Sequence, residues 1–259
     1  MRPVSLTLAL AMGLGLTQSP MVVGIDHVPV AVGDLDRAGD RYRSLGFALK
    51  DGRPHEDGIR NLHAKFTDGT EIELITAPAA TDALTRTYRE HLKAGDGPAF
   101  LALFAAPDVP VERRLEDAGV HVPEYVFFAR GERSPTDRPE HFAHANSAER
   151  VTRVWLAGDD LSAERRLLAA LGARVRRETV DVPEAVQADV AEFGRGSVVL
   201  LPGRCQIVRG RPIVGITVDV RDLDAARQHA GPQARRTGHS IFVDPQRALG
   251  YWLEFRGRG

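Results

Sequence analysis

The hydrophobic and polar positions of the chain repeat one pattern four times. An apolar stretch is followed by a short acidic turn and then by a segment whose apolar residues fall on one helical face. The four copies read "VPVAVGDLDRAGDRYRSLGF" from residue 28, "LALFAAPDVPVERRLEDAGV" from 101, "VWLAGDDLSAERRLLAALGA" from 154 and "ITVDVRDLDAARQHAG" from 216. Each copy therefore predicts a strand, a turn and an amphipathic helix.

Each copy also carries residues suited to the two ends of its helix. The turn aspartate can accept a backbone hydrogen bond from the first helical turn, and the glycine that follows can end the helix in a left-handed conformation. The aspartates are Asp34, Asp108, Asp160 and Asp222, and the glycines are Gly46, Gly119, Gly172 and Gly231. The pattern thus predicts where each helix begins and ends.

Runs rich in β-forming residues stand between the copies and complete the unit. "NLHAKF" (residues 61–66) and "TEIELI" (70–75) are joined by an Asp-Gly turn, which is typical of a hairpin. We predict an α+β fold of four βαβββ modules, which should pair because a single module leaves one sheet face exposed. Modules 1 and 2 are expected to form a domain over residues 21–149, and modules 3 and 4 a second domain over 150–259.

The alternation of side chains in the strands places a histidine and a glutamate on one face. Three valines at alternate positions from residue 28 are predicted to face the helix, so Ile25 and His27 should face the concave side. Glu71 and Glu73 alternate with apolar positions in "TEIELI" and point to that same side. We interpret Glu71 as a surface charge, and His27 with Glu73 as a candidate metal pair, since imidazole and carboxylate suit Fe, Mn, Zn or Ni.

A pair of ligands is too few for a stable metal site, so a third is needed from another module. Glu254 occupies the same relative place in the last unit as Glu73 does in the first, which makes it the third candidate ligand. His141 and His144, in "PEHFAHANSA", are further candidates for the site.

Composition and charge limit the classes of partner. The chain has 259 residues, 43% hydrophobic and 27% charged, with a formal net charge of -1. This balance is typical of a soluble globular protein and argues against a broad electrostatic attraction to nucleic acid. Because Cys205 is the single cysteine, an internal disulfide and a multi-thiolate metal site are both excluded.

The first twenty residues, "MRPVSLTLALAMGLGLTQSP", differ from the rest of the chain. A positive start followed by a short apolar stretch is typical of a signal peptide and is too short to span a bilayer stably. This predicts export to the periplasm or the medium. The alternative is a mis-assigned start, with translation beginning at Met21 and a cytoplasmic protein.

The stretch from residue 25 to residue 78 resembles the first module of the glyoxalase-like proteins of the vicinal oxygen chelate superfamily. The resemblance rests on Asp26 and His27 in the first strand, on Gly46-Phe47 after the helix, and on "RPHEDGIRN" and the closing "EIELI". It implies paired βαβββ modules that form two incompletely closed mixed β-barrels. In metal-dependent members the ligands come from the first and last strands of a module, which correspond to His27 and Glu73. The second histidine of that pattern is missing here, at about Leu101.

Two functions follow from these observations. The first is a lyase, isomerase or dioxygenase that acts on a small oxygenated metabolite with help from a divalent metal. Its candidate metal ligands are His27, Glu73 and Glu254, and its candidate substrate-binding residues are His55, Asn61, His141 and His144. The second is a metal-free module that binds a small ligand without catalysis. Either protein is expected to be a monomer or a homodimer.

Overall fold

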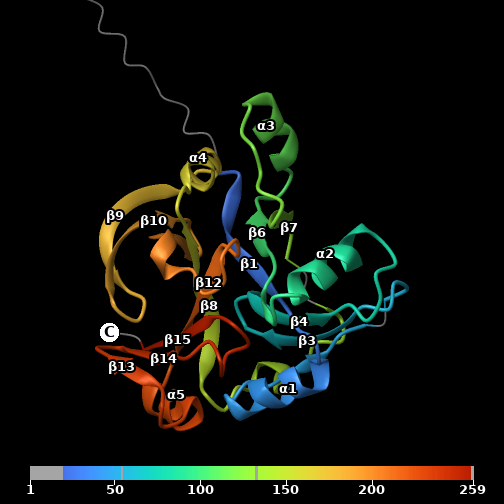
Figure 1. The fold of residues 1–259 in the computed structure, drawn as a ribbon, viewed down its shortest axis with the longest axis vertical. Helices are drawn as coiled ribbons and strands as arrows, with labels where there is room; N and C mark the ends of the chain where they lie inside the picture. The colour runs from blue at the N-terminus through green and yellow to red at the C-terminus, as the bar shows by residue number, and fades with distance from the viewer. Residues whose placement is uncertain (1–19, 54, 132–133, 258–259) are drawn as a thin grey trace, which may run out of the picture.

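The chain folds into two curled mixed sheets that lie side by side (Figure 1). The computed structural model describes residues 20–53, 55–131 and 134–257, so residues 1–19 of the predicted leader lie outside the described residues. Figure 1 shows the N-terminal sheet in blue to green and the C-terminal sheet in yellow to red. Within the described residues, the helices are too short or too polar to cross a membrane.

The N-terminal sheet is seven-stranded, in the order β2-β3-β4-β1-β6-β7 with β5 beside β1. Its strands are β1 (Val22–Ala31), β2 (Lys50–Asp51), β3 (Arg60–Lys65), β4 (Glu71–Thr76), β5 (Gly97–Pro98), β6 (Leu101–Ala105) and β7 (Val126–Ala129). Its helices are α1 (Leu35–Ser44), α2 (Ala83–Leu92) and α3 (Val111–Asp117), with a 3-10 turn η1 (Pro139–Phe142).

The C-terminal sheet is eight-stranded, in the order β13-β14-β15-β12-β8-β11-β10-β9. Its strands are β8 (Ala148–Gly158), β9 (Arg174–Asp181), β10 (Ala185–Glu192), β11 (Ser197–Pro202), β12 (Ile213–Val220), β13 (Arg235–Thr237), β14 (Ser240–Val243) and β15 (Trp252–Gly257). Its helices are α4 (Ser162–Ala170) and α5 (Leu223–Ala230), with a 3-10 turn η2 (Gly203–Cys205).

The α+β class and the two curled mixed sheets are confirmed, but the second module is shorter than predicted. The first, third and fourth modules each have a strand, a helix and three further strands. The second has β6, α3 and β7, and the described residues between β7 and β8 contain only η1. Pro135 and Pro139 follow β7 and lack the backbone N–H that a strand pair requires, which disfavours further strands there.

The helix ends follow the predicted pattern in part. Asp34 accepts a hydrogen bond from Arg37 N, and Asp222 accepts bonds from the first turn of α5. Asp108 does not cap α3, because its own φ is +58° and the helix starts later, after Pro110. Asp160 accepts a hydrogen bond from Ser162 N, but it lies one residue before the N-cap residue of α4, which is Leu161. The four predicted helix-ending glycines all adopt positive φ.

The concave side of the C-terminal sheet is filled by side chains. Trp155 is 1% exposed and lies among valines of β9, β10 and β11, with Phe242 on its other side. Its indole Nε1 donates to Thr217 Oγ1 at 2.9 Å. Gly215 makes room for the ring, because a Cβ there would lie 2.1 Å from Trp155 Cε3. The C-terminal sheet, which curls into a half-barrel, is therefore packed around Trp155.

Replacing Trp155 by alanine should destabilise the protein by about 3–5 kcal/mol, because the change empties a closely packed site. Trp252→Ala, which removes a half-buried ring from the same sheet, should lower the free energy of unfolding by a smaller amount. Urea unfolding of the two variants gives both values. Equal losses of stability would contradict the conclusion that Trp155 is the central packing residue.

Candidate functional site

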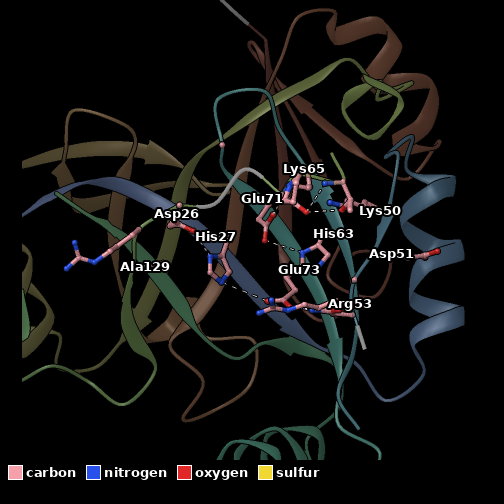
Figure 2. A pocket seen from close by; sticks show the side chains of 18 of the residues that line it. Asp26, His27, Lys50, Asp51, Arg53, His63, Lys65, Glu71, Glu73 and Ala129 are labelled. Atoms are coloured by element: carbon pink, nitrogen blue, oxygen red, sulfur yellow. Dashed lines mark hydrogen bonds and ion pairs between the residues drawn. The ribbon is translucent and has the colours of Figure 1, made fainter. Parts of the chain in front are cut away.

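A cavity of about 680 Å³ lies on the concave side of the N-terminal sheet. Its floor comes from β1, β3 and β4, and its sides come from the segment after β2 and the segment after β7. Figure 2 shows His27, His63, Glu71 and Glu73 gathered at its centre. Most of the lining is polar or charged, so the cavity suits a polar ligand.

A β-bulge in β1 brings two adjacent side chains into this cavity. Ile25 pairs with Leu103 of β6 and His27 pairs with the next residue, Ala102, so that Asp26 is the extra residue on the bulged strand. In an unbroken strand Asp26 and His27 would point to opposite faces. Here both line the cavity, and His27 Nδ1 donates to Asp26 Oδ1 at 2.6 Å. The same shift turns Ile25 into the core, against the prediction from alternation.

Glu73 faces the other ring nitrogen of His27. His27 Nε2 lies 3.9 Å from Glu73 Oε2, while Asn61 Nδ2 donates to Glu73 Oε1 at 2.6 Å. Burial would lower the pKa of His27, but the hydrogen bond to Asp26 and the charges of Glu73 and Glu71 outweigh it and raise the pKa above 6.5. The imidazole is thus held between two carboxylates, with one nitrogen fixed and the other directed toward Glu73.

Glu71 and His63 also line the cavity, although Glu71 was expected to be a surface charge. His63 Nδ1 lies 3.1 Å from Glu71 Oε1, and Lys65 Nζ lies 3.9 Å from Glu71 Oε2. Burial raises the pKa of Glu71, yet the bond and charge of His63 lower it more, so the net shift is downward. The hairpin register could have revealed this cluster, because the Asp-Gly turn sets Lys65 opposite Glu71 and His63 opposite Glu73.

Two lysines of the cavity wall bind a carboxylate from the segment after β7. Lys50 Nζ and Lys65 Nζ lie 2.5 and 2.8 Å from the carboxylate oxygens of Asp137. Burial would raise the pKa of Asp137, but the hydrogen bonds from the two lysines lower it from 3.8 to about 2. This partly buried pairing anchors the segment that forms one side of the cavity.

Three buried polar atoms at the cavity have no hydrogen-bond partner among the described residues. They are Asp26 Oδ2, His55 Nε2 and Asn61 Oδ1. A buried polar atom without a partner costs about 1–3 kcal/mol, and native proteins contain few of them. Their concentration around one cavity indicates a place where a ligand or ordered water supplies the missing bonds.

Three of the residues predicted for the site lie elsewhere. His144 is buried between Phe47 and Phe66, and its Nε2 donates to Lys65 O at 2.9 Å, so it is a packed core residue. His141 is in η1, where its Nδ1 accepts from Arg138 N. Neither ring lines the cavity.

Glu254 belongs to the C-terminal sheet and cannot join His27 and Glu73. Its Oε2 accepts from Thr217 Oγ1 at 2.6 Å and its Oε1 accepts from Ser240 Oγ. Burial raises the pKa of Glu254 despite these two bonds. The carboxyl is part of the buried polar network beside Trp155.

The donor set fits a three-ligand metal centre only in part. His27 Nε2 and Glu73 Oε2 face each other, and the hydrogen bond that His27 Nδ1 donates to Asp26 is typical of a metal-bound histidine. The third donor is missing, however. Leu101 is packed in the core, Ala102 stands opposite His27, and the ring of Phe127 lies 5.4 Å from the imidazole. Within residues 20–53, 55–131 and 134–257 no three His, Cys, Asp or Glu side chains form a metal-binding group.

Comparison with known proteins finds a family for the part of the chain that contains the cavity. Residues 25–141 match the family described as "Glyoxalase-like domain". Residues 25–141 are thus similar to this family, and we refer to them as the glyoxalase-like domain. No curated protein matches the chain significantly in sequence.

Solved structures show that the likeness in fold extends over almost the whole chain. A variant of 4-hydroxymandelate synthase from Streptomyces coelicolor has 15% identity and a TM-score of 0.64, over 92% of this chain and 93% of that one. A variant of homoprotocatechuate 2,3-dioxygenase from B. fuscum has 12% identity and a TM-score of 0.63, over 92% and 72%. A catechol 2,3-dioxygenase has 12% identity and a TM-score of 0.62, over 92% and 88%. The likeness in fold thus extends beyond residues 25–141 to the C-terminal sheet.

The pairing of Asp137 should make part of the stability dependent on acid pH. The pKa of Asp137 is lower in the folded domain than in the unfolded chain, so the stabilisation is present above about pH 4. It is lost as the pH falls toward the folded pKa of about 2. Asp137→Asn should therefore lower the unfolding temperature at pH 7, and the gap from the wild type should narrow between pH 4 and pH 2.

The matched control for this measurement is Asp51→Asn, which removes one negative charge from an exposed side chain that points away from the cluster in Figure 2. We expect it to change the unfolding temperature little at any pH. If the difference in unfolding temperature between Asp137→Asn and the wild type stays constant down to pH 2, the ionised Asp137 is not the source of the stabilisation.

Proposed function

We propose that the protein is an enzyme that transfers a proton on a small oxygenated metabolite bound in the cavity of the glyoxalase-like domain. Reactions of this class include isomerisation and elimination. The proposal rests on one observation, which is that His27 is hydrogen bonded to Asp26 and faces Glu73 inside a polar cavity.

His27 is the residue that moves the proton. Asp26 accepts the Nδ1 hydrogen and so fixes the neutral ring with its lone pair on Nε2, the nitrogen that faces Glu73. When Nε2 takes a proton from the substrate, the imidazolium that forms is stabilised by carboxylates on both sides. The raised pKa of His27 has the same cause. A base of this strength is well matched to proton transfer near neutral pH.

The substrate is held by the polar atoms that have no protein partner. Asn61 Oδ1 is available to accept a hydrogen bond from a hydroxyl group of the ligand, and His55 Nε2 can accept one from a hydroxyl group or, when it carries the proton, donate one to a carbonyl oxygen. Asn61 also holds Glu73 in place through its Nδ2. These contacts favour a metabolite with several oxygen atoms, in agreement with the size and polarity of the cavity.

We assign no step to a divalent metal. His27 and Glu73 could supply two of its ligands, but Ala102, which is paired with His27, and Phe127, whose ring lies beside the imidazole, carry no group that binds a metal. The dioxygenases and the synthase of similar fold support the proposal of a small-molecule substrate, and at 12–15% identity they do not carry their reactions over to this chain.

The proposal predicts that the protein catalyses hydrogen exchange at an acidic carbon. A panel of 2-oxo acids, 2-hydroxy acids and 1,2-dicarbonyl compounds is incubated with the protein in D₂O, and deuterium incorporation is followed by proton NMR. At least one compound should exchange, and His27→Ala should slow that exchange by about 10²–10⁴-fold, the usual contribution of a general base. Because the neutral imidazole is the active form, the rate should rise with pH and reach half its maximum above pH 6.5.

The control variant is His141→Ala, which removes a histidine outside the cavity and should leave the exchange rate unchanged. Prior dialysis against EDTA should also have no effect. An equal loss in both histidine variants, or a rate that EDTA abolishes and a divalent metal restores, would disprove metal-free catalysis by His27.

A binding module without catalysis is the second candidate, and the three unpartnered polar atoms favour it independently. The same panel separates the two functions. A compound that raises the unfolding temperature equally in the wild type and in His27→Ala, without any deuterium exchange, would identify the cavity as a binding site only.

A further inference from the structure

The first half of β1 lacks a neighbouring strand on one side within its own sheet. β4 pairs with β1 from His27 to Ala31, so the segment from Val22 to Asp26 extends beyond the start of β4. Backbone groups left open inside a protein need other partners. They find them in the C-terminal half of the chain.

The partner is the turn between β10 and β11, residues 193–196, which we name the docking turn. Arg195 N donates to Val23 O at 2.9 Å, and Ile25 N donates to Arg195 O at 3.1 Å. Arg195 thus forms a parallel bridge with Gly24 and continues the line of β4 beside β1. The two bonds hold the backbone immediately before the bulged residue Asp26.

Glycines on both sides allow this close approach. A Cβ on Gly24 would lie 1.8 Å from Arg195 O, which no side chain can tolerate. Gly196 has φ +83°, and a Cβ there would lie 2.9 Å from Thr152 O and 3.1 Å from Ile25 Cδ1. The contact between the halves is therefore specific to these backbone positions.

The side chain of Arg195 also reaches toward the N-terminal sheet. Its guanidinium lies 5.4 Å from the centre of the Phe104 ring and donates to Asp68 O. A small pocket of about 180 Å³ lies there, lined by Asp26, Phe104 and Arg195 among others. Arg195 of the docking turn and Asp26 consequently line the same small pocket.

We propose that the docking turn is a positioning element for the Asp26–His27 pair, so that the C-terminal half of the chain sets the geometry of the site in the glyoxalase-like domain. The turn fixes Val23 and Ile25, and the fixed backbone holds Asp26 in the bulge with its carboxylate on the cavity face. Without the turn, β1 relaxes toward regular alternation and Asp26 leaves His27. The effect of the turn on catalysis rests on the proposed function, whereas its effect on the geometry of Asp26 and His27 does not depend on that function.

Two variants of the full chain test the docking turn, each with a matched control. Gly24→Ala places a Cβ against Arg195 O, while Gly33→Ala adds the same atom 3.7 Å from its nearest neighbour. Gly196→Ala strains a left-handed residue in the turn, while Gly210→Ala imposes the same strain at φ +82° in open space.

The main readout is the His27 Nδ1 proton, observed by NMR in protein labelled with ¹⁵N-histidine. The wild type should show a strongly downfield signal from the hydrogen bond to Asp26, and Asp26→Asn identifies it by shifting it. We expect Gly24→Ala and Gly196→Ala to lose this signal, and their rate of deuterium exchange at saturating substrate to fall at least tenfold. The controls Gly33→Ala and Gly210→Ala should keep the signal and the rate of the wild type. A signal that survives in Gly24→Ala and Gly196→Ala, or disappears in Gly210→Ala as well, would overturn the proposal.

A measurement on the unmodified protein covers the case in which a variant does not fold. Amide hydrogen exchange of the wild type should show the Arg195 amide as slow as the Ile25 amide, because the two form one paired unit. An Arg195 amide that exchanges as fast as a surface loop would refute docking. Neither the NMR signal nor amide exchange requires a substrate, so both decide the role of the turn even if no compound in the panel reacts.

Discussion

The bulge at Asp26 is the feature on which the candidate site depends. A regular strand alternates its side chains, so adjacent residues cannot cooperate on one face. The extra residue in β1 breaks that alternation for one step and sets a carboxylate 2.6 Å from the imidazole next to it. It also turns Ile25 into the core, which ties the geometry of the site to the packing beneath it.

The two sheets share a topology but use their concave faces differently. Thr217 pairs with Glu254 as Pro29 pairs with Glu73, so Gly215 stands at the place in β12 that His27 occupies in β1. The missing side chain at Gly215 leaves space for Trp155, and the C-terminal barrel is packed around that ring. In the glyoxalase-like domain the same place carries a histidine, and the space remains open.

Charge pairing explains why so polar a cavity is compatible with a folded protein. A buried charge is costly unless an opposite charge and hydrogen bonds accompany it. Asp137 pairs with Lys50 and Lys65, and His63 pairs with Glu71. Within the part of the chain that the structure describes, four buried side-chain atoms lack a hydrogen-bond partner, and three of them belong to residues that line this cavity. Most of the unmet hydrogen-bonding capacity therefore lies where a ligand would bind.

The sequence by itself determined the repeated strand-turn-helix pattern, the α+β class and the shared face of His27 and Glu73, because alternation and helical periodicity are local properties. It also held the register of the β3–β4 hairpin, from which His63 and Glu71 follow. Tertiary structure decided the rest. The bulge that recruits Asp26, the pairing of Arg195 with β1, and the separation of Glu254, His141 and His144 from the cavity all depend on contacts between segments far apart in the chain. No local pattern encodes such contacts, because each depends on how segments far apart in the chain pack against one another in the folded protein.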